Sequence, residues 1–219
     1  MTLLEIVKRL AQEAGIAGGA TAITTVANAT GEVRRVVDWA VSAWSEIQGQ
    51  LRWNFLWEQP TLTLLAGTST IAGTVPEPRY VRESGWLLKP ASSADQWLTF
   101  MPWGEFSNVY RRLNTDDNVT CWTVRPDGVI AFNARVTADT DVLLERYRNP
   151  VVLATDTDTP AAPEHLHMIV VWRALVLYAN FDEAGVQRQT AVEEYRALHA
   201  QMCSQCLPSL ELGAPMIEE

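Results

Sequence analysis

The sequence predicts an α+β fold: N-terminal helices and a C-terminal helical hairpin form a helix bundle, and a small antiparallel β-sheet subdomain with one short helix is inserted between them. Apolar residues recur at steps of three and four near both ends of the chain, which is the spacing of amphipathic helices. Between residues 61 and 147 the period changes to two, and turn residues separate the alternating segments. These patterns predict a helical bundle domain over residues 1–58 and 159–203, a β subdomain over residues 59–158, and an extended C-terminal tail over residues 204–219.

Two helices are predicted at the N-terminal end. The first covers residues 2–13, and Gly15 follows as a stop signal. The second begins after Thr30, whose hydroxyl oxygen can cap the helix, and its apolar positions keep helical spacing as far as Leu51. This second helix leads directly into an aromatic cluster, Trp53–Trp57.

The middle of the chain predicts short strands and one helix. The predicted strands are Thr61–Leu65, Thr68–Ile71, Tyr80–Leu88, Trp97–Met101, Val119–Val124, Val129–Phe132 and Asp141–Tyr147. The strands on either side of Pro126-Asp127-Gly128 form the strongest hairpin signal, because these three residue types favour a tight turn. Residues 102–113 predict the embedded helix, since its apolar residues fall on one side: Phe106, Val109, Tyr110 and Leu113.

The C-terminal hairpin is predicted to hold the core. A polar connector, residues 153–160, leads into a helix that starts between Pro160 and Pro163, with Glu164 at the positive end of its dipole. This helix is apolar over nearly its whole circumference, so other elements must cover it on several sides. Residues 182–185 break the helix, and a second, half-exposed helix follows. Its predicted apolar stripe comprises Val186, Thr190, Val192, Tyr195, Leu198, His199 and Met202.

Composition and charge exclude several classes of protein. Apolar residues make up 47% of the 219 residues and charged residues 20%, which is typical of a globular protein. The net charge is −9 and no basic run occurs, so we expect no specific binding to DNA or RNA, which requires clustered Lys and Arg. No apolar run approaches the roughly 20 residues of a membrane span, and the charged N-terminus is not a signal peptide.

The chain contains nine tryptophans, and these predict an assembly surface. Tryptophan is enriched at the well-packed centres of protein interfaces, although any one of the nine can equally fill the core of its own subunit.

Cys203 and Cys206 form a CxxC pair, and His199 lies four residues before it. A structural zinc site needs four ligands, and Cys121 is the only other thiol in the sequence. A redox CxxC normally opens a helix after a strand, whereas this pair ends a helix. The simpler interpretation is that the three thiols have no function in a reduced protein. The alternative function is a thiol-based metal-binding or redox protein that uses Cys203 and Cys206.

The remaining polar residues predict neither an enzyme nor a cofactor site. His165 and His167 are two apart, so they do not share a helix face as a metal-binding pair would, and we interpret them as a solvated helix end. Asp156 and Asp158 are interpreted as a solvated turn. No nucleophile elbow, phosphate-binding loop or zinc-protease motif occurs, so we predict no catalytic, cofactor or metal residues.

The order of several segments resembles a known family. Residues 2–7 open a helix, residues 33–57 form a helix followed by Trp53-Asn54-Phe55-Leu56-Trp57, residues 106–112 form the embedded helix, and Tyr147–Pro150 leads through Asp156–Pro160 into the hairpin. In this order the chain resembles the head-to-tail adaptor (connector, or head-completion) proteins of tailed bacteriophages, including tail accessory and gatekeeper proteins. Cys203, Cys206 and the tail after Leu207 lie outside the matching pattern.

The resemblance implies a structural protein of the virion head–tail junction, made in the host bacterial cytoplasm. It implies a ring, typically of twelve copies, that docks on the portal protein, extends the DNA channel and offers a platform to a downstream tail or nozzle protein. Genomic DNA would pass through without specific binding, since an acidic lining repels phosphates. A tail terminator is the other virion component considered.

Candidate surfaces for this assembly follow from the predicted elements. The predicted subunit-interface anchors are Trp39, Trp53 and Trp57, because the second helix already uses another face for the core. The predicted portal-docking residues are the apolar residues of the tail, Leu207, Leu210, Leu212, Met216 and Ile217.

Overall fold

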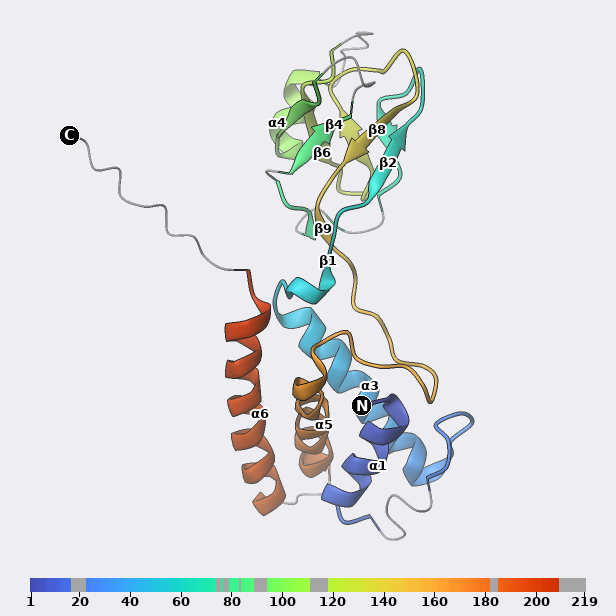
Figure 1. Cartoon of the computed structure of the whole chain (residues 1–219), viewed down its shortest axis with the longest axis vertical. Helices are drawn as coiled ribbons and strands as arrows, with labels where there is room; N and C mark the ends of the chain where they lie inside the picture. Colours follow the sequence, from blue (N-terminus) through green and yellow to red (C-terminus); the bar gives the residue numbers. More distant parts are fainter. Residues whose placement is uncertain are drawn as a thin grey trace, which may run out of the picture. The chain divides into compact units, whose positions relative to one another are not determined.

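The computed structural model describes residues 1–16, 23–73, 76, 79–82, 84–88, 94–110, 118–181 and 185–208. Over these residues the protein is a mixed α+β structure with five α-helices and a seven-stranded sheet, so the predicted α+β class is confirmed. The chain forms two compact units, shown in Figure 1. The helical unit comprises Met1–Leu56 and Pro150–Glu219, and the sheet unit comprises Trp57–Asn149.

Four α-helices build the helical unit. They are α1 (Leu3–Glu13), α3 (Gly31–Gln50), α5 (Met168–Phe181) and α6 (Gly185–Cys206), and two short 3-10 turns, η1 (Asn54–Leu56) and η3 (Glu164–Leu166), accompany them. Helix α5 contacts α1, α3 and α6, and half of its residues are buried. The helix that is apolar nearly all round therefore occupies the centre of this unit, because only a central position covers it on several sides.

Two details of the helices differ from the sequence expectation. Thr30 precedes α3, but its side chain makes no capping hydrogen bond. The buried positions of α6 include Ala191, Met202 and Cys206, whereas Val186 and Thr190 are exposed. The predicted stripe is therefore wrong at its N-terminal end, where the first buried residue is Ala191.

The sheet unit contains nine strands among its described residues. They are β1 (Trp57–Glu58), β2 (Thr61–Leu64), β3 (Thr70–Ile71), β4 (Gly85–Leu87), β5 (Gln96–Phe100), β6 (Cys121–Val124), β7 (Ile130–Phe132), β8 (Thr140–Leu143) and β9 (Arg146–Tyr147). Seven of them form one sheet in the order β2-β8-β4-β5-β6-β7-β3, and β1 pairs with β9 separately. The β6–β7 hairpin is present as predicted, but residues 141–147 form two strands rather than one.

The predicted purely antiparallel sheet is wrong at one junction. Strands β5 and β6 run parallel, with Thr99 opposite Cys121 and Phe100 opposite Trp122. The reason is the embedded helix α4 (Trp103–Tyr110), which lies between these strands in the sequence. Parallel neighbours need a long crossover, and a helix is the usual way to supply it.

One face of the sheet packs around the core of this unit, and helix α4 covers part of the other face. The core side chains include Leu64, Leu98, Trp122, Ile130 and Val142. On the opposite face, Phe106 of α4 packs against Cys121 and Ala131, so α4 covers the β6–β7 end of the sheet. Strands β2, β8, β4 and β5 form the other part of that face. Two exposed tryptophans, Trp86 and Trp97, lie on β4 and β5.

Candidate functional site

Two large exposed side chains face each other across neighbouring strands of the sheet unit. Trp86 of β4 lies directly opposite Trp97 of β5, and their rings meet edge to face at a centroid distance of 4.8 Å and an interplanar angle of 83°. Trp86 is 37% exposed and Trp97 is 44% exposed. Leu143 of β8, half-buried, is the partner of Trp86 on its other side. The pairing places all three side chains on one side of the sheet, in the part of that face that α4 does not cover, because opposed residues point to the same side of a sheet.

Trp57, on β1 of the same unit, is a further exposed tryptophan. It is 45% exposed, and its indole Nε1 donates a hydrogen bond to Glu145 Oε2 at 3.1 Å. Gln59 Nε2 donates to the other oxygen of the same carboxylate at 3.3 Å. Glu145 lies two residues after Leu143, between the end of β8 and the start of β9. We call Trp57, Trp86, Trp97 and Leu143 the tryptophan face.

The polar groups near the tryptophan face carry both signs of charge. Asp141 precedes Leu143 by two residues and accepts a hydrogen bond from Thr63 Oγ1 at 2.8 Å. Glu145 accepts from the Trp57 indole, and Arg82 lines the same pocket as Trp97. Such a surface suits a partner that brings apolar side chains together with charged groups.

Trp39 belongs to a second aromatic surface, on the helical unit. Its ring is half-buried and contacts Tyr178 at 5.4 Å and Phe181 at 5.7 Å between centroids, joining α3 to the end of α5. Phe181 is 61% exposed, and the guanidinium of Arg35 lies over its ring at 5.3 Å. These four residues form the Trp39 cluster, which still presents apolar area to a partner.

Trp53 is not available to a partner. The side chain is 0% exposed, its Nε1 donates to the backbone oxygen of Ile47 at 2.6 Å, and its ring stacks on Phe55. Its selection as an interface anchor is therefore corrected: Trp53 closes the core of its own unit where the chain turns away from α3. Sequence spacing does not separate Trp53 from Trp57, because both lie just outside regular helix.

Sequence reasoning missed Trp86 and Trp97 as surface residues, although a signal existed. Both alternate with apolar residues that the structure buries, Leu87 and Leu98. Strict alternation in a strand assigns neighbours to opposite faces, so the two tryptophans and the two leucines had to divide between core and surface. In both strands the tryptophan lies at the surface and the smaller leucine is buried, which residue size alone does not predict.

Of the predicted portal-docking residues, only Leu207 lies within the described part of the chain. Leu207 directly follows α6 and is half-buried. Leu210, Leu212, Met216 and Ile217 lie outside the described residues.

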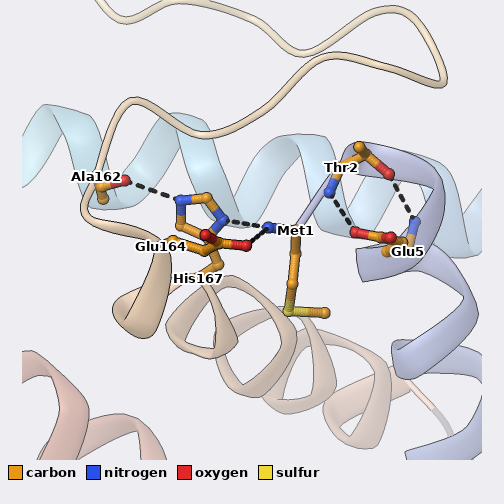
Figure 2. A network of polar contacts seen from close by, with 6 residues as sticks. All are labelled: Met1, Thr2, Glu5, Ala162, Glu164 and His167. Atoms are coloured by element: carbon orange, nitrogen blue, oxygen red, sulfur yellow. Dashed lines mark hydrogen bonds and ion pairs between the residues drawn. The ribbon is translucent and has the colours of Figure 1, made fainter.

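His167 is buried and takes part in a polar network, so the prediction of a solvated helix end is wrong for it (Figure 2). The amino group of Met1 lies 2.8 Å from His167 Nδ1 and 3.6 Å from a carboxylate oxygen of Glu164. His167 Nε2 lies 2.8 Å from the backbone oxygen of Ala162, an acceptor, so Nε2 carries the proton and Nδ1 accepts from the amine. His165, by contrast, is exposed.

The two aspartates of the connector organise the start of the chain. Asp156 accepts hydrogen bonds from Val26 N at 2.6 Å and Thr25 Oγ1 at 2.8 Å. The backbone oxygens of Asp158 and Asp156 accept from the first amides of α1, Leu3 and Leu4. In addition, Thr2 and Glu5 exchange side-chain and backbone bonds as a capping box (Figure 2). The backbone oxygens of the connector therefore hold the start of α1, and the Asp156 carboxylate ties the connector to Thr25 and Val26.

The side chain of Asp158 holds its own loop. It accepts from the backbone amides of Ala154 at 2.7 Å and Thr155 at 2.9 Å, and from the Thr155 hydroxyl. The Thr155 hydroxyl, followed by the two amides, lowers the pKa of Asp158 below its ordinary value. Asp158 is a structural residue, since every one of these bonds stabilises the ionised carboxylate.

The described part of the chain contains neither a cluster of metal ligands nor a membrane-spanning helix. No group of three or more His, Cys, Asp or Glu side chains there could hold a metal ion. Cys121 and Cys206 are buried and Cys203 is half-buried, all as free thiols. None of the helices among these residues is both long and apolar enough to cross a membrane.

Comparison with known proteins identifies the family. None of the curated proteins compared with the chain matches it. A family model described as SU10 adaptor protein matches residues 1–211, which includes both the helical and the sheet unit. The resemblance deduced from the order of the segments is therefore confirmed: the chain belongs to the SU10 adaptor protein family, a family of phage head–tail adaptors.

Proposed function

We propose that this protein is a non-enzymatic component of the virion that closes into a ring of twelve copies between the phage head and tail. The ring docks on the portal protein, extends the DNA channel and presents a platform to a downstream tail or nozzle protein. The family match supports a structural phage adaptor as the starting point. Ring size, portal docking and tail attachment are the parts that we add to it.

The exposed aromatic surfaces are the observation that carries the ring proposal. Trp57, Trp86 and Trp97 each expose between 37% and 45% of their surface on one unit. A tryptophan buries up to about 250 Å², so each has about 100 Å² left to cover, worth about 2.5 kcal/mol at about 25 cal/mol per Å². A second copy is the occupant that we assign to the tryptophan face and to the Trp39 cluster. Trp39 and Trp57 therefore remain interface anchors, joined by Trp86 and Trp97.

The charge of the chain supports passage of DNA without specific binding. There are 26 acidic and 17 basic residues, and the net charge is −9. A channel lined by acidic subunits repels phosphates, which keeps DNA from adhering during packaging and ejection.

The C-terminal stretch is the proposed contact with the portal. We assign this role to Leu207, Leu210, Leu212, Met216 and Ile217, which supply apolar side chains after the end of α6. Synthesis takes place in the host bacterial cytoplasm, and the finished location is the head–tail junction of the virion.

One experiment tests the proposal directly. The purified chain, with and without its portal protein, is examined by native mass spectrometry and electron microscopy. A closed twelve-subunit ring seated on the portal is expected. A chain that stays monomeric with the portal present contradicts the ring, and a position at the far end of the tail in labelled virions would identify a tail terminator instead.

A further inference from the structure

Two thiols and an imidazole lie together on the last turns of α6. Cys203 Sγ is 3.6 Å from His199 Nδ1, within the reach of a sulfur hydrogen bond. Cys203 is half-buried and Cys206 is buried, three residues further along the same helix. Residues four and three apart share a helix face, so His199, Cys203 and Cys206 form one line.

The hydrogen bond made by His199 Nε2 determines which ring nitrogen carries the proton. His199 Nε2 lies 3.1 Å from Gln50 Oε1, a side-chain oxygen that only accepts, so Nε2–H is the donor. Tyr195 donates its hydroxyl to the same oxygen at 3.2 Å. His199 Nδ1 is therefore free of hydrogen and accepts from the Cys203 thiol.

This arrangement has the parts of an activated thiol. A nucleophile next to a base that a third group orients is the general pattern of thiol activation, and here the three are Cys203, His199 and Gln50. The edge of His199 also packs against the ring of Trp53 at 5.9 Å, which holds the imidazole plane. No part of the adaptor role uses these groups.

Helix geometry lets the two thiols join after a small local change. Residues three apart in an α-helix have Cα atoms about 5 Å apart, inside the disulfide range of about 4.4–6.8 Å. Their Cβ atoms are about 5–6 Å apart, whereas a disulfide needs about 3.5–4.5 Å. Cys206 is the last residue of α6, so the final turn can tighten without breaking the helix interior.

We propose that Cys203 and Cys206 are a redox-active dithiol that reacts with small-molecule disulfides, with Cys203 as the attacking residue and Cys206 as the resolving one. The Cys203 proton passes to His199 Nδ1, and the thiolate breaks the S–S bond of the small disulfide. A mixed disulfide forms on Cys203, and the departing thiolate takes a proton. Cys206 then loses its proton and attacks the Cys203 sulfur, forming the Cys203–Cys206 bond and releasing a second small thiol. Overall, one dithiol is oxidised and one small disulfide is reduced to two thiols.

The surroundings of the thiols assign the two roles. Burial, followed by the charge of Cys203, raises the pKa of Cys206, which leaves it a poor first attacker. Cys121 lies beneath α4 in the sheet unit, and burial raises its pKa as well. Cys121 therefore serves as an internal reference thiol in every measurement.

The test uses the full-length reduced protein and oxidised glutathione as the probe, with intact and peptide mass spectrometry as the readout. The expected product has lost two hydrogen atoms and is linked between Cys203 and Cys206, with Cys121 unmodified. Cys206→Ser should stop at a glutathione adduct on Cys203, and Cys203→Ser should leave residue 206 unmodified. His199→Gln, which keeps a side chain against Trp53, should slow the adduct at least about tenfold.

A remote variant separates activation from packing. Gln50 is exposed, so Gln50→Ala leaves the core intact but frees the His199 tautomer, and it should slow Cys203 by a smaller factor than His199→Gln. Equal rates at Cys203 and Cys121, an adduct on Cys206 first, or no effect of His199→Gln would overturn the proposal. So would stoichiometric zinc retained through gel filtration, because the thiols would then be ligands. This inference is independent of the ring, since a monomer can satisfy it.

Discussion

At the scale of single residues, the position of a side chain relative to its own backbone neighbours decides whether it serves stability or assembly. Trp53 and Trp57 are four residues apart, yet Trp53 is enclosed and Trp57 is 45% exposed. Asp158 and Glu145 are both carboxylates that receive several donors, but Asp158 holds a loop while Glu145 orients an indole at the surface. Residue type alone therefore does not assign the role.

Gly85 gives a sharp residue-scale prediction. A Cβ at this position would lie 2.5 Å from Trp122 Nε1 and 2.9 Å from its Cδ1, and Trp122 is fully buried. We expect Gly85→Ala to destabilise the fold by about 1–3 kcal/mol, the usual cost of overpacking a core. Urea unfolding of both proteins measures the difference.

Gly49 is the matched control for that experiment. A Cβ at Gly49 in α3 meets nothing within 4 Å. Gly49→Ala should therefore stabilise the protein by about 0.5–1 kcal/mol, because alanine loses less backbone entropy in a helix. If the two substitutions had the same sign, contact with Trp122 would not be the cause.

Asp158 gives a prediction about pH. Its folded-state pKa is lowered, so the carboxylate contributes stability above the pKa of the unfolded chain, and that stability is lost as the pH falls through the folded-state value. Asp158→Asn should lower the melting temperature at about pH 7, and its difference from the wild type should shrink as the pH falls through the folded-state pKa of Asp158, where the carboxyl takes up its proton.

Thr155 tests the cause of the Asp158 effect. Its hydroxyl is the main group that lowers the pKa of Asp158. Thr155→Val should move part of the loss of stability to higher pH, whereas a melting curve with unchanged pH dependence would argue against that hydrogen bond.

At the scale of elements, the embedded helix decides both the topology and the exposed surface of the sheet. Helix α4 carries the chain from β5 to a parallel β6 and covers that end of the outer face. Within the described residues no helix covers β4 and β8, where Trp86 and Leu143 lie beside Trp97 of β5. One short helix therefore separates a covered from an uncovered half of the same surface.

The segment after α6 gives the element-scale prediction. Removing residues 207–219 should weaken binding to the portal protein at least about tenfold if their five apolar side chains contribute about 1.4 kcal/mol or more. The measurement is co-sedimentation of the truncated chain with portal rings. Unchanged affinity, with a far-UV spectrum like that of the full chain, would contradict the assignment.

At the scale of the whole molecule, ring formation is expected to depend on the tryptophan face more than on any other exposed apolar side chain of the sheet unit. The double variant Trp86→Ala, Trp97→Ala should abolish rings in native mass spectra while the monomer loses only the edge-to-face pair, about 0.5–1.5 kcal/mol. Val109→Ala on α4, also exposed, is the control and should leave assembly intact. Normal rings from the double variant would assign another surface to the neighbouring copy.

The sequence by itself determined the α+β class, the long helices and the β6–β7 hairpin, because periods of 3.6 and two and a tight turn are local properties. It also carried the order of segments by which the family was identified. Only the tertiary structure decided that β5 and β6 run parallel, that Trp53 and His167 are enclosed while Trp86 and Trp97 are not, and that His199 joins Gln50 to Cys203. The physical reason is that local spacing sets which side chains share a face, whereas what covers that face comes from segments far away in the chain.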